Sequence, residues 1–138
     1  MNCDGTTNQE VNIPGTVIIS PGYPGNYSDN MDCTTTIRFA EGERVLLEVI
    51  SFNLEHCGDY CGCDKLEIRD GDNAYASRFK CSMCGSSSNC STIVSSGNAV
   101  YMNFVTDGSV TYSGFEIRAI VAGKSYFRRY NIFSSPLV

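Results

Sequence analysis

The stretch AVYMNFVTDGSVTYSGFEIRAIV, residues 99–121, decides the fold because two alternating apolar runs flank a polar connection. Successive side chains of a β-strand point to opposite faces, so residues two apart share a face. The runs AVYMNFV (99–105) and GFEIRAIV (114–121) both alternate in this way, and we predict two neighbouring strands, each with one buried face. The residues expected on the buried faces are Val100, Met102, Phe104, Phe115, Ile117, Ala119 and Val121.

Three further runs predict strands. In TTTIRF (34–39) and DKLEIR (64–69) the apolar residues occupy one parity, whereas in RVLLEVISF (44–52) both parities are apolar. The last pattern predicts a strand covered on both faces. Stretches rich in Gly, Pro, Asn, Asp and Ser, typical of tight turns, separate the runs at residues 20–30, 69–73 and 95–98. Helix signals are scarce, so we predict an all-β fold of the antiparallel sandwich or barrel type.

Length and cysteine content indicate a single extracellular domain. A chain of 138 residues, 42% of them hydrophobic and 18% charged, suits one folded core. Eight cysteines, an even number, are typical of a disulfide framework formed in an oxidising compartment. No apolar run reaches the roughly 20 residues that a membrane-spanning helix needs. Two sequons, at Asn26 and Asn89, are compatible with a secreted glycoprotein.

The charge is unevenly distributed along the chain. Residues 1–122 hold 7 basic and 15 acidic side chains, a net charge of −8, whereas residues 123–138 hold 3 basic side chains and no acid. Nucleic acid requires a basic surface, so a cationic partner fits this protein better. We interpret residues 1–122 as the folded domain and residues 123–138 as a linker, an extra edge strand or an interface segment. The sequence leaves the oligomeric state open, although an acidic site and a basic tail permit head-to-tail association.

The stretch FNLEHCGDYCGCDKLEIRDG (52–71) crowds acidic side chains and cysteines around the single histidine, His56. Zinc held by cysteine is one interpretation, because Cys81 and Cys84 have the C-x-x-C spacing. A secreted chain oxidises its thiols, so we favour disulfides over zinc. No Ser-His-Asp or Cys-His pattern is evident around the one histidine, and we predict a non-catalytic protein.

Several fragments together resemble the CUB family of extracellular modules. They are SPGYPGNYSDNMDCTTTIRF (20–39), the stretch 52–71, IVSSGNAVYMNFVTD (93–107) and SGFEIRA (113–119), in the order and spacing of the family. The resemblance implies a jelly-roll β-sandwich of two antiparallel sheets. One departure is Thr35, which stands where the family usually has a tryptophan.

The resemblance also implies two disulfides, Cys3–Cys33 and Cys61–Cys84. Four cysteines remain, and they flank the second of these bridges along the sequence: Cys57, Cys63, Cys81 and Cys90. We predict that they form two further disulfides, which tie the loop between Cys57 and Cys63 to the loop between Cys81 and Cys90. Which cysteine pairs with which stays open.

A calcium site is the next implication of the resemblance. The positions that match the calcium ligands of the family are Glu55, Asp64 and Asp107, with backbone carbonyls near Ser109 and Val110. Ca²⁺ takes about six to eight oxygen ligands, which carboxylates from separate loops provide. Carboxylates brought so close repel one another, and a bound cation removes that repulsion. We therefore predict Ca²⁺ as the cofactor.

The same resemblance predicts the function. We expect a non-catalytic extracellular module in which calcium organises an acidic surface that captures a Lys or Arg of a protein partner. The residues expected to face that partner are Glu55, Asp64, Asp107 and Ser109.

Two alternatives stay open. The first is a stand-alone carbohydrate-binding module similar to spermadhesins, with exposed tyrosines that stack on sugar; the candidates are Tyr23, Tyr27, Tyr60 and Tyr112. The second is an accessory domain of a secreted protease of the astacin or complement type.

Overall fold

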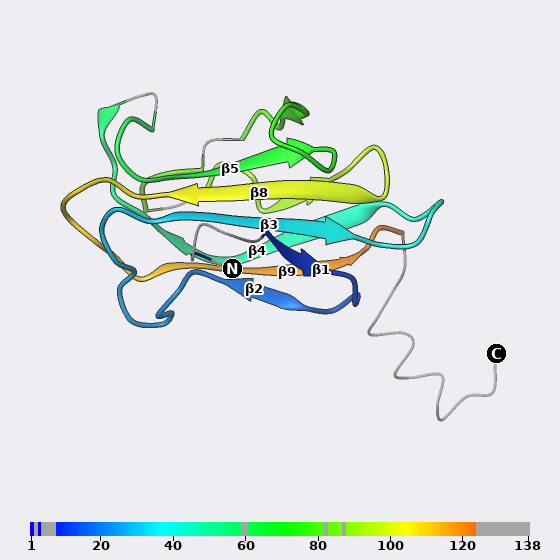
Figure 1. Cartoon of the computed structure of the whole chain (residues 1–138), viewed down its shortest axis with the longest axis horizontal. Coiled ribbons are helices and arrows are strands. Elements are labelled where there is room, and N and C mark those ends of the chain that lie inside the picture. The colour runs from blue at the N-terminus through cyan, green and yellow to red at the C-terminus, as the bar shows by residue number, and fades with distance from the viewer. Residues whose placement is uncertain (2, 4–7, 59–60, 82, 87, 124–138) are drawn as a thin grey trace.

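The structure, a computed structural model, describes residues 1, 3, 8–58, 61–81, 83–86 and 88–123. The strands within them are β1 (Gln9–Val11), β2 (Val17–Ile19), β3 (Asp32–Arg38), β4 (Val45–Asn53), β5 (Lys65–Asp70), β6 (Ser77–Arg78), β7 (Thr92–Val94), β8 (Ala99–Val105) and β9 (Gly114–Val121). They make a five-stranded sheet of order β1-β3-β8-β5-β6 and a four-stranded sheet of order β2-β9-β4-β7 (Figure 1). The predicted all-β sandwich is confirmed.

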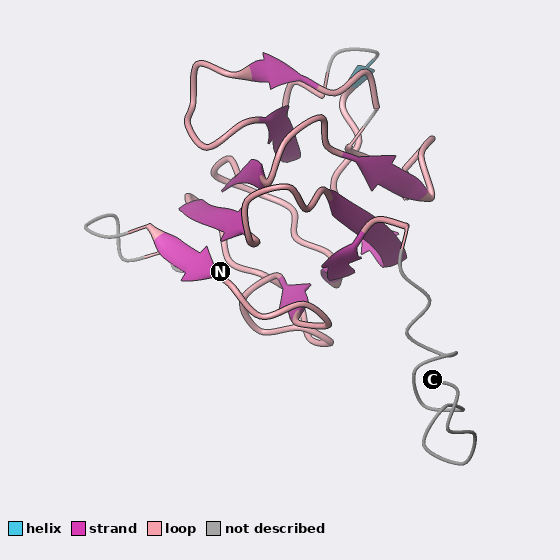
Figure 2. Ribbon diagram, turned by 90° about the vertical axis from the view of Figure 1, so that its right-hand side faces the viewer, coloured by secondary structure: helices cyan, strands magenta, loops and turns pink. Residues whose placement is uncertain are grey.

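Most neighbouring strands run antiparallel. The exception within the described residues is β1, which pairs with β3 in parallel and places Gln9 opposite Thr35. Figure 2 views the sandwich from one end and shows the loops that join the strands of the two sheets. The sheets therefore pack face to face, and the loops collect at the two ends.

The core lies between the sheets, where alternation along each strand directs apolar side chains. On β8 the inward residues Val100, Met102 and Phe104 are fully buried, as are Phe115 and Ile117 on β9. The rings of Phe104 and Phe115 meet edge to face, with centroids 5.1 Å apart. The two strands belong to different sheets, so the prediction that they are neighbours is wrong. Their polar connection crosses from one sheet to the other instead of closing a hairpin.

β4 departs from regular alternation. Leu47 is fully buried and Phe52 is buried, but Ile50 is 46% exposed. The register of β4 against β9 shifts between Val49 and Ser51, which marks a β-bulge. The bulge changes the parity that points inward, so apolar residues occupy both parities although only one face meets the core. The prediction that this strand is covered on both faces is therefore wrong.

Four disulfides cross-link the domain. Two are the bridges that the resemblance implies, Cys3–Cys33 and Cys61–Cys84. The others are Cys57–Cys63 and Cys81–Cys90, with sequence separations of 6 and 9. Each of these closes its own loop, so the prediction that they tie the two loops together is wrong. Short loops cost little entropy to close, and Cys61–Cys84 alone supplies the link between them.

Three connections gather at the left-hand end of the sandwich in Figure 1: residues 20–31, the described residues 54–58 and 61–64, and residues 106–113. The chain leaves β9 at the opposite end. Of the predicted tail, residues 123–138, only Gly123 lies within the described residues. In the described part of the chain, no helix has the length and apolar character needed to cross a membrane.

Candidate metal centre

Three strand ends deliver three carboxylates to one place. Glu55 follows β4, Asp64 directly precedes β5, and Asp107 follows β8. β5 and β8 are antiparallel neighbours in which Lys65 lies opposite Val105, so Asp64 and Asp107 emerge at the same end of the sheet. Carboxylate oxygens of the three acids all lie within 4.8 Å of one another. The structure thus brings together the three acids that the sequence singles out.

Asp64 forms the buried floor of this cluster. Its side chain is fully buried, and both oxygens accept hydrogen bonds. The hydroxyl of Tyr27 donates to Oδ2 at 2.6 Å, and the backbone N–H of Asp107 donates to Oδ1 at 2.8 Å. A buried carboxylate requires such partners, and these two fix its orientation.

Glu55 lies half-buried above the floor. Its backbone N–H donates to the hydroxyl of Tyr27 at 3.1 Å, which ties the loop after β4 to the same tyrosine. Its Oε1 atom is buried without a hydrogen-bond partner in the described part of the chain. A buried carboxylate oxygen that lacks a donor carries a desolvation cost, which a cation at that position removes.

The pKa values of the cluster shift in the direction expected for crowded acids. Burial, followed by the negative charge of Asp107, raises the pKa of Glu55. Burial also raises the pKa of Asp64, against the opposing effect of the hydrogen bonds from Tyr27 and from the N–H of Asp107. Burial likewise raises the pKa of Tyr27, so its hydroxyl stays protonated and remains a donor. Without a cation the cluster resists full ionisation.

The third loop holds the other predicted contacts. The N–H of Ser109 donates to Oδ1 of Asp107 at 3.3 Å, so the loop curls around that carboxylate. Ser109 and Val110 are exposed, and Val110 has a φ of 65°, in the left-handed region. Left-handed backbone at a β-branched residue is strained and is often found in binding loops. Both predicted residues therefore lie in the loop that carries Asp107.

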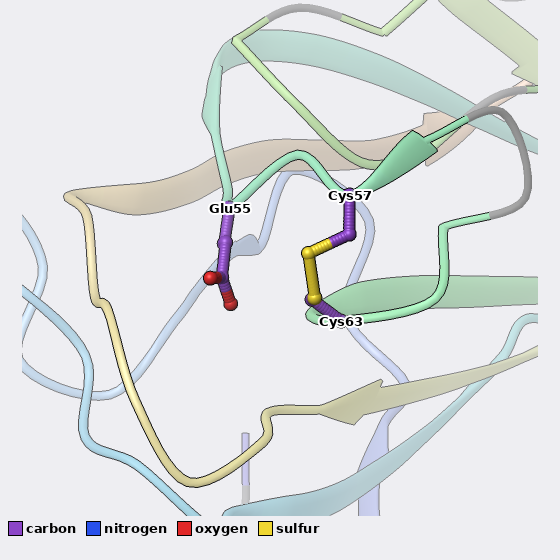
Figure 3. Close-up of side chains that lie close together, drawn as sticks. All are labelled: Glu55, Cys57 and Cys63. Carbon is purple, nitrogen blue, oxygen red and sulfur yellow. A yellow bond between two sulfur atoms is a disulfide. The ribbon is translucent and has the colours of Figure 1, made fainter.

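A second group of potential ligands consists of Glu55, Cys57 and Cys63, whose ligand atoms also lie within 4.8 Å of one another. Figure 3 shows that the two sulfurs are bonded to each other beside the Glu55 side chain. All eight cysteines of the chain are in disulfides. Disulfide sulfur is not a zinc ligand, so a zinc site built on cysteine is excluded.

The sequence interpretation missed the role of Tyr27. It was expected among the exposed tyrosines, yet it is 2% exposed and hydrogen-bonds to the acidic cluster. Tyr23 is partly exposed and Tyr112 is 41% exposed, whereas Tyr60 lies outside the described residues. The sequence also gave no signal for Asp29, whose charge contributes to the raised pKa of Glu55.

The two predicted glycosylation sites lie on the surface. Asn26 and Asn89 are both exposed. The side chain of Asn26 donates to the carbonyl of Thr111 at 3.4 Å, which places this sequon beside the loop that carries Asp107.

The paired sheets, the four disulfides and the acidic loop end, formed by Glu55, Asp64 and Asp107, define a disulfide-linked β-sandwich module. The CUB domain family matches residues 3–118, and the chain belongs to this family. Human "Tumor necrosis factor-inducible gene 6 protein" is 36% identical over 110 residues, which cover 78% of this chain and 38% of that protein. "Blastula protease 10" of Paracentrotus lividus is 35% identical over 105 residues, or 75% of this chain and 17% of that protein.

A solved structure has the same fold. The MASP-1 CUB2 domain bound to Ca²⁺ superposes with a TM-score of 0.70 at 23% sequence identity, over 81% of this chain and 96% of that chain. CUB domains are non-catalytic interaction modules of extracellular proteins, and some lie as accessory domains within proteases. The chain spans 38% or less of the two curated relatives described above.

Proposed function

We propose that this chain is a calcium-dependent protein-binding module whose acidic loop end captures a Lys or Arg side chain of an extracellular partner. The observation that carries the proposal is the buried Oε1 of Glu55, which has no hydrogen-bond partner in the described residues. It belongs to a cluster in which one carboxylate oxygen from each of Glu55, Asp64 and Asp107 lies within 4.8 Å of the other two. The cation would occupy the space that these oxygens share.

The donor set fits calcium. Carboxylate oxygens from three separate loops are hard ligands, and Ca²⁺ accepts the flexible geometry that such loops give. Glu55, Asp64 and Asp107 would hold the ion, with oxygens of Ser109 and Val110 and water completing the shell. The calcium bound to the MASP-1 CUB2 domain supports the same choice of metal.

Charge supports capture of a cationic side chain. Residues 1–122 have a net charge of −8. An acidic surface steers a basic ligand toward it, and a carboxylate held by calcium can still accept a hydrogen bond from an ammonium or guanidinium group. Ser109 is exposed beside Asp107 and offers a hydroxyl to the same ligand. One ionic contact is weak, so strength would come from several copies of the module.

A second candidate, compatible with the first, is an accessory role beside a protease domain. The supporting observation is that Blastula protease 10 contains a segment 35% identical to this chain. In that setting the acidic loop end would bind the substrate or an assembly partner of the neighbouring enzyme. Carbohydrate binding has weaker support, because Tyr27 is buried and only Tyr23 and Tyr112 keep exposed surface among the described candidates.

The first experiment titrates oxidised protein with Ca²⁺ by isothermal calorimetry. We expect one site that disappears in Glu55→Gln and in Asp107→Asn, with a melting temperature that rises in calcium relative to EDTA. The matched control is Glu41→Gln, an exposed glutamate in the turn before β4 at the opposite end of the sandwich. Absence of heat and of a shift in the melt would contradict calcium binding at the three acids.

The second experiment tests the ligand. Surfaces coated densely with a lysine-bearing peptide should retain the protein in calcium, and the same peptide with acetylated lysine should not, because acetylation removes the charge. EDTA and Glu55→Gln should both abolish retention. Equal binding to the two peptides would contradict capture of a cationic side chain.

A further inference from the structure

The Cys57–Cys63 disulfide joins the two chain segments that carry Glu55 and Asp64. Cys57 lies two residues after Glu55, and Cys63 directly precedes Asp64. The bridge spans a sequence separation of 6 and holds its Cα atoms 5.6 Å apart. We propose that this disulfide preorganises the calcium site by fixing Glu55 relative to Asp64; the inference rests on the proposed function.

The bridge lies close to the side chain of Glu55 as well as joining the two backbone segments. A carboxylate oxygen of Glu55 and the sulfurs of Cys57 and Cys63 lie within 4.8 Å of one another. Figure 3 shows the Glu55 side chain extending beside the sulfur–sulfur bond. The sulfurs therefore limit the space that the Glu55 side chain can enter, in addition to holding the two segments together.

The loop closed by this bridge contains two glycines, which increase the conformational freedom of the unbridged chain. Its sequence, CGDYCGC, contains Gly58 and Gly62. Gly58 has a φ of 66° and Cys61 a φ of 52°, so two positions have left-handed backbone. Ordering such a loop costs conformational entropy. With the bridge closed, that cost is met on folding instead of on calcium binding, which strengthens the apparent affinity.

Tyr27 and the Cys57–Cys63 bridge position different parts of Glu55. The hydroxyl of Tyr27 hydrogen-bonds to the Asp64 side chain and to the backbone N–H of Glu55, so it fixes the backbone position of Glu55. Oε1 of Glu55 has no hydrogen bond within the described residues, so the neighbouring disulfide contributes to the position of its carboxylate. Groups that orient metal ligands without touching the ion typically change metal affinity by about 10- to 100-fold. We assign Cys57 and Cys63 to this class of positioning residue.

The chain offers a matched control in Cys81–Cys90. This bridge is also local, with a sequence separation of 9, and both cysteines are partly buried against the core. It closes a loop that carries none of the three acids. Loss of either bridge removes a constraint on the unfolded chain, so both losses lower stability. Only loss of Cys57–Cys63 frees calcium ligands.

The test compares Cys57→Ser/Cys63→Ser with Cys81→Ser/Cys90→Ser by calcium calorimetry and by melting in EDTA. We expect both double variants to melt at lower temperature, while calcium affinity falls at least about 10-fold in the first and stays within about twofold of the parent in the second. Equal affinity in the first variant and the parent would overturn the inference. Equal losses in both variants would overturn it as well, because they would indicate general loosening.

An insertion keeps the inference testable where the first variant does not fold. Gly-Gly placed after Gly58 lengthens the loop inside the closed ring, and the bridge still holds Glu55 and Asp64 together. Calcium affinity should then stay within about twofold of the parent, and a loss of about 10-fold or more would overturn the inference. A parent protein that binds no calcium overturns the proposed function and this inference together. A parent that binds calcium with unchanged affinity after bridge removal overturns only the inference.

Discussion

The hydroxyl of Tyr27 donates a 2.6 Å hydrogen bond to Oδ2 of Asp64, the fully buried carboxylate at the start of β5. The same hydroxyl accepts the backbone N–H of Glu55. Tyr27, in the loop before β3, thereby connects Glu55, which follows β4, with Asp64, which precedes β5. The acidic cluster is thus built into the core edge and is not a surface accumulation of charge.

Tyr27→Phe tests this connection. The ring keeps its edge-to-face contact with Phe104, at a centroid distance of 5.1 Å, while Asp64 and the N–H of Glu55 lose their partner. We expect the free energy of unfolding in EDTA to fall by about 1–3 kcal/mol, the cost of leaving buried polar groups unsatisfied. Urea denaturation measures it, with Tyr75→Phe as the control because Tyr75 is 96% exposed. Equal stability of the two variants would refute the structural role of the hydroxyl.

The raised pKa values predict how the calcium-free domain responds to pH. Burial and Asp107 raise the pKa of Glu55 above its ordinary 4.5, and burial raises that of Asp64 above 3.8. The native state then keeps protons that the unfolded chain has released. In EDTA this contribution to stability is full below the ordinary values and is lost as pH rises through the raised ones.

Thermal melts in EDTA across this pH range check the sign. The difference in melting temperature between Glu55→Gln and the parent should grow in favour of the variant as pH rises, because Gln never has to ionise. Glu41→Gln, at an exposed glutamate, should follow the parent at every pH. In calcium the trend of the parent should reverse, since the ion binds the ionised carboxylates and releases their protons.

Local periodicity explains which strands the sequence predicts. β5 and β8 are long enough for alternation to stand out, and Leu66, Ile68 and Met102 are buried as expected. β1, β2 and β6 have 3, 3 and 2 residues, too few for any period to be recognised. Their positions follow from pairing with longer strands, which is a property of the folded molecule.

Which strands pair with each other, and which cysteines bond to each other, is not determined by the local sequence pattern. Alternation in β8 and β9 is the same whether the strands are neighbours or face each other across the core. The bulge between Val49 and Ser51 and the local pairing of Cys57 with Cys63 depend likewise on three-dimensional position. The three acids of the site were predicted through the family resemblance. The role of Tyr27 was not predicted, because the sequence around a tyrosine in a turn does not indicate whether its side chain is buried or exposed.

Gly114, the first residue of β9, has no room for a larger side chain. It has a φ of 86°, and a Cβ there would overlap Oγ of Ser20, a fully buried side chain that accepts the N–H of Phe115. Gly114→Ala should lower the free energy of unfolding by about 2–5 kcal/mol, combining left-handed strain with overpacking. Gly42 has a φ of 87° and open space around it.

Gly42→Ala therefore isolates the backbone contribution to the effect at Gly114. We expect it to cost about 1–2 kcal/mol, the penalty of placing a Cβ on left-handed backbone. Urea denaturation of both variants in the same buffer measures the difference. Similar losses at the two glycines would show that the contact with Ser20 carries no weight.

Val110 has a strained backbone conformation and lies in the loop that carries Asp107. Its φ of 65° is unfavourable for a β-branched residue, and its side chain is half exposed in the loop that carries Asp107. Asn and Gly both accept left-handed backbone, so Val110→Asn and Val110→Gly should each relieve about 1 kcal/mol of strain. Urea denaturation in EDTA measures that gain, with Val94→Asn in strand β7 as the control that gains nothing.

Calcium affinity separates the two substitutions at Val110. Asn adds an amide oxygen, a ligand type that Ca²⁺ accepts, whereas Gly adds none. We expect calorimetry to give tighter calcium binding for Val110→Asn than for Val110→Gly, with the glycine variant close to the parent. The pair therefore distinguishes a ligand contribution from simple relief of strain, because both variants share the second effect. Identical affinities for the two variants would mean that residue 110 does not reach the ion through its side chain.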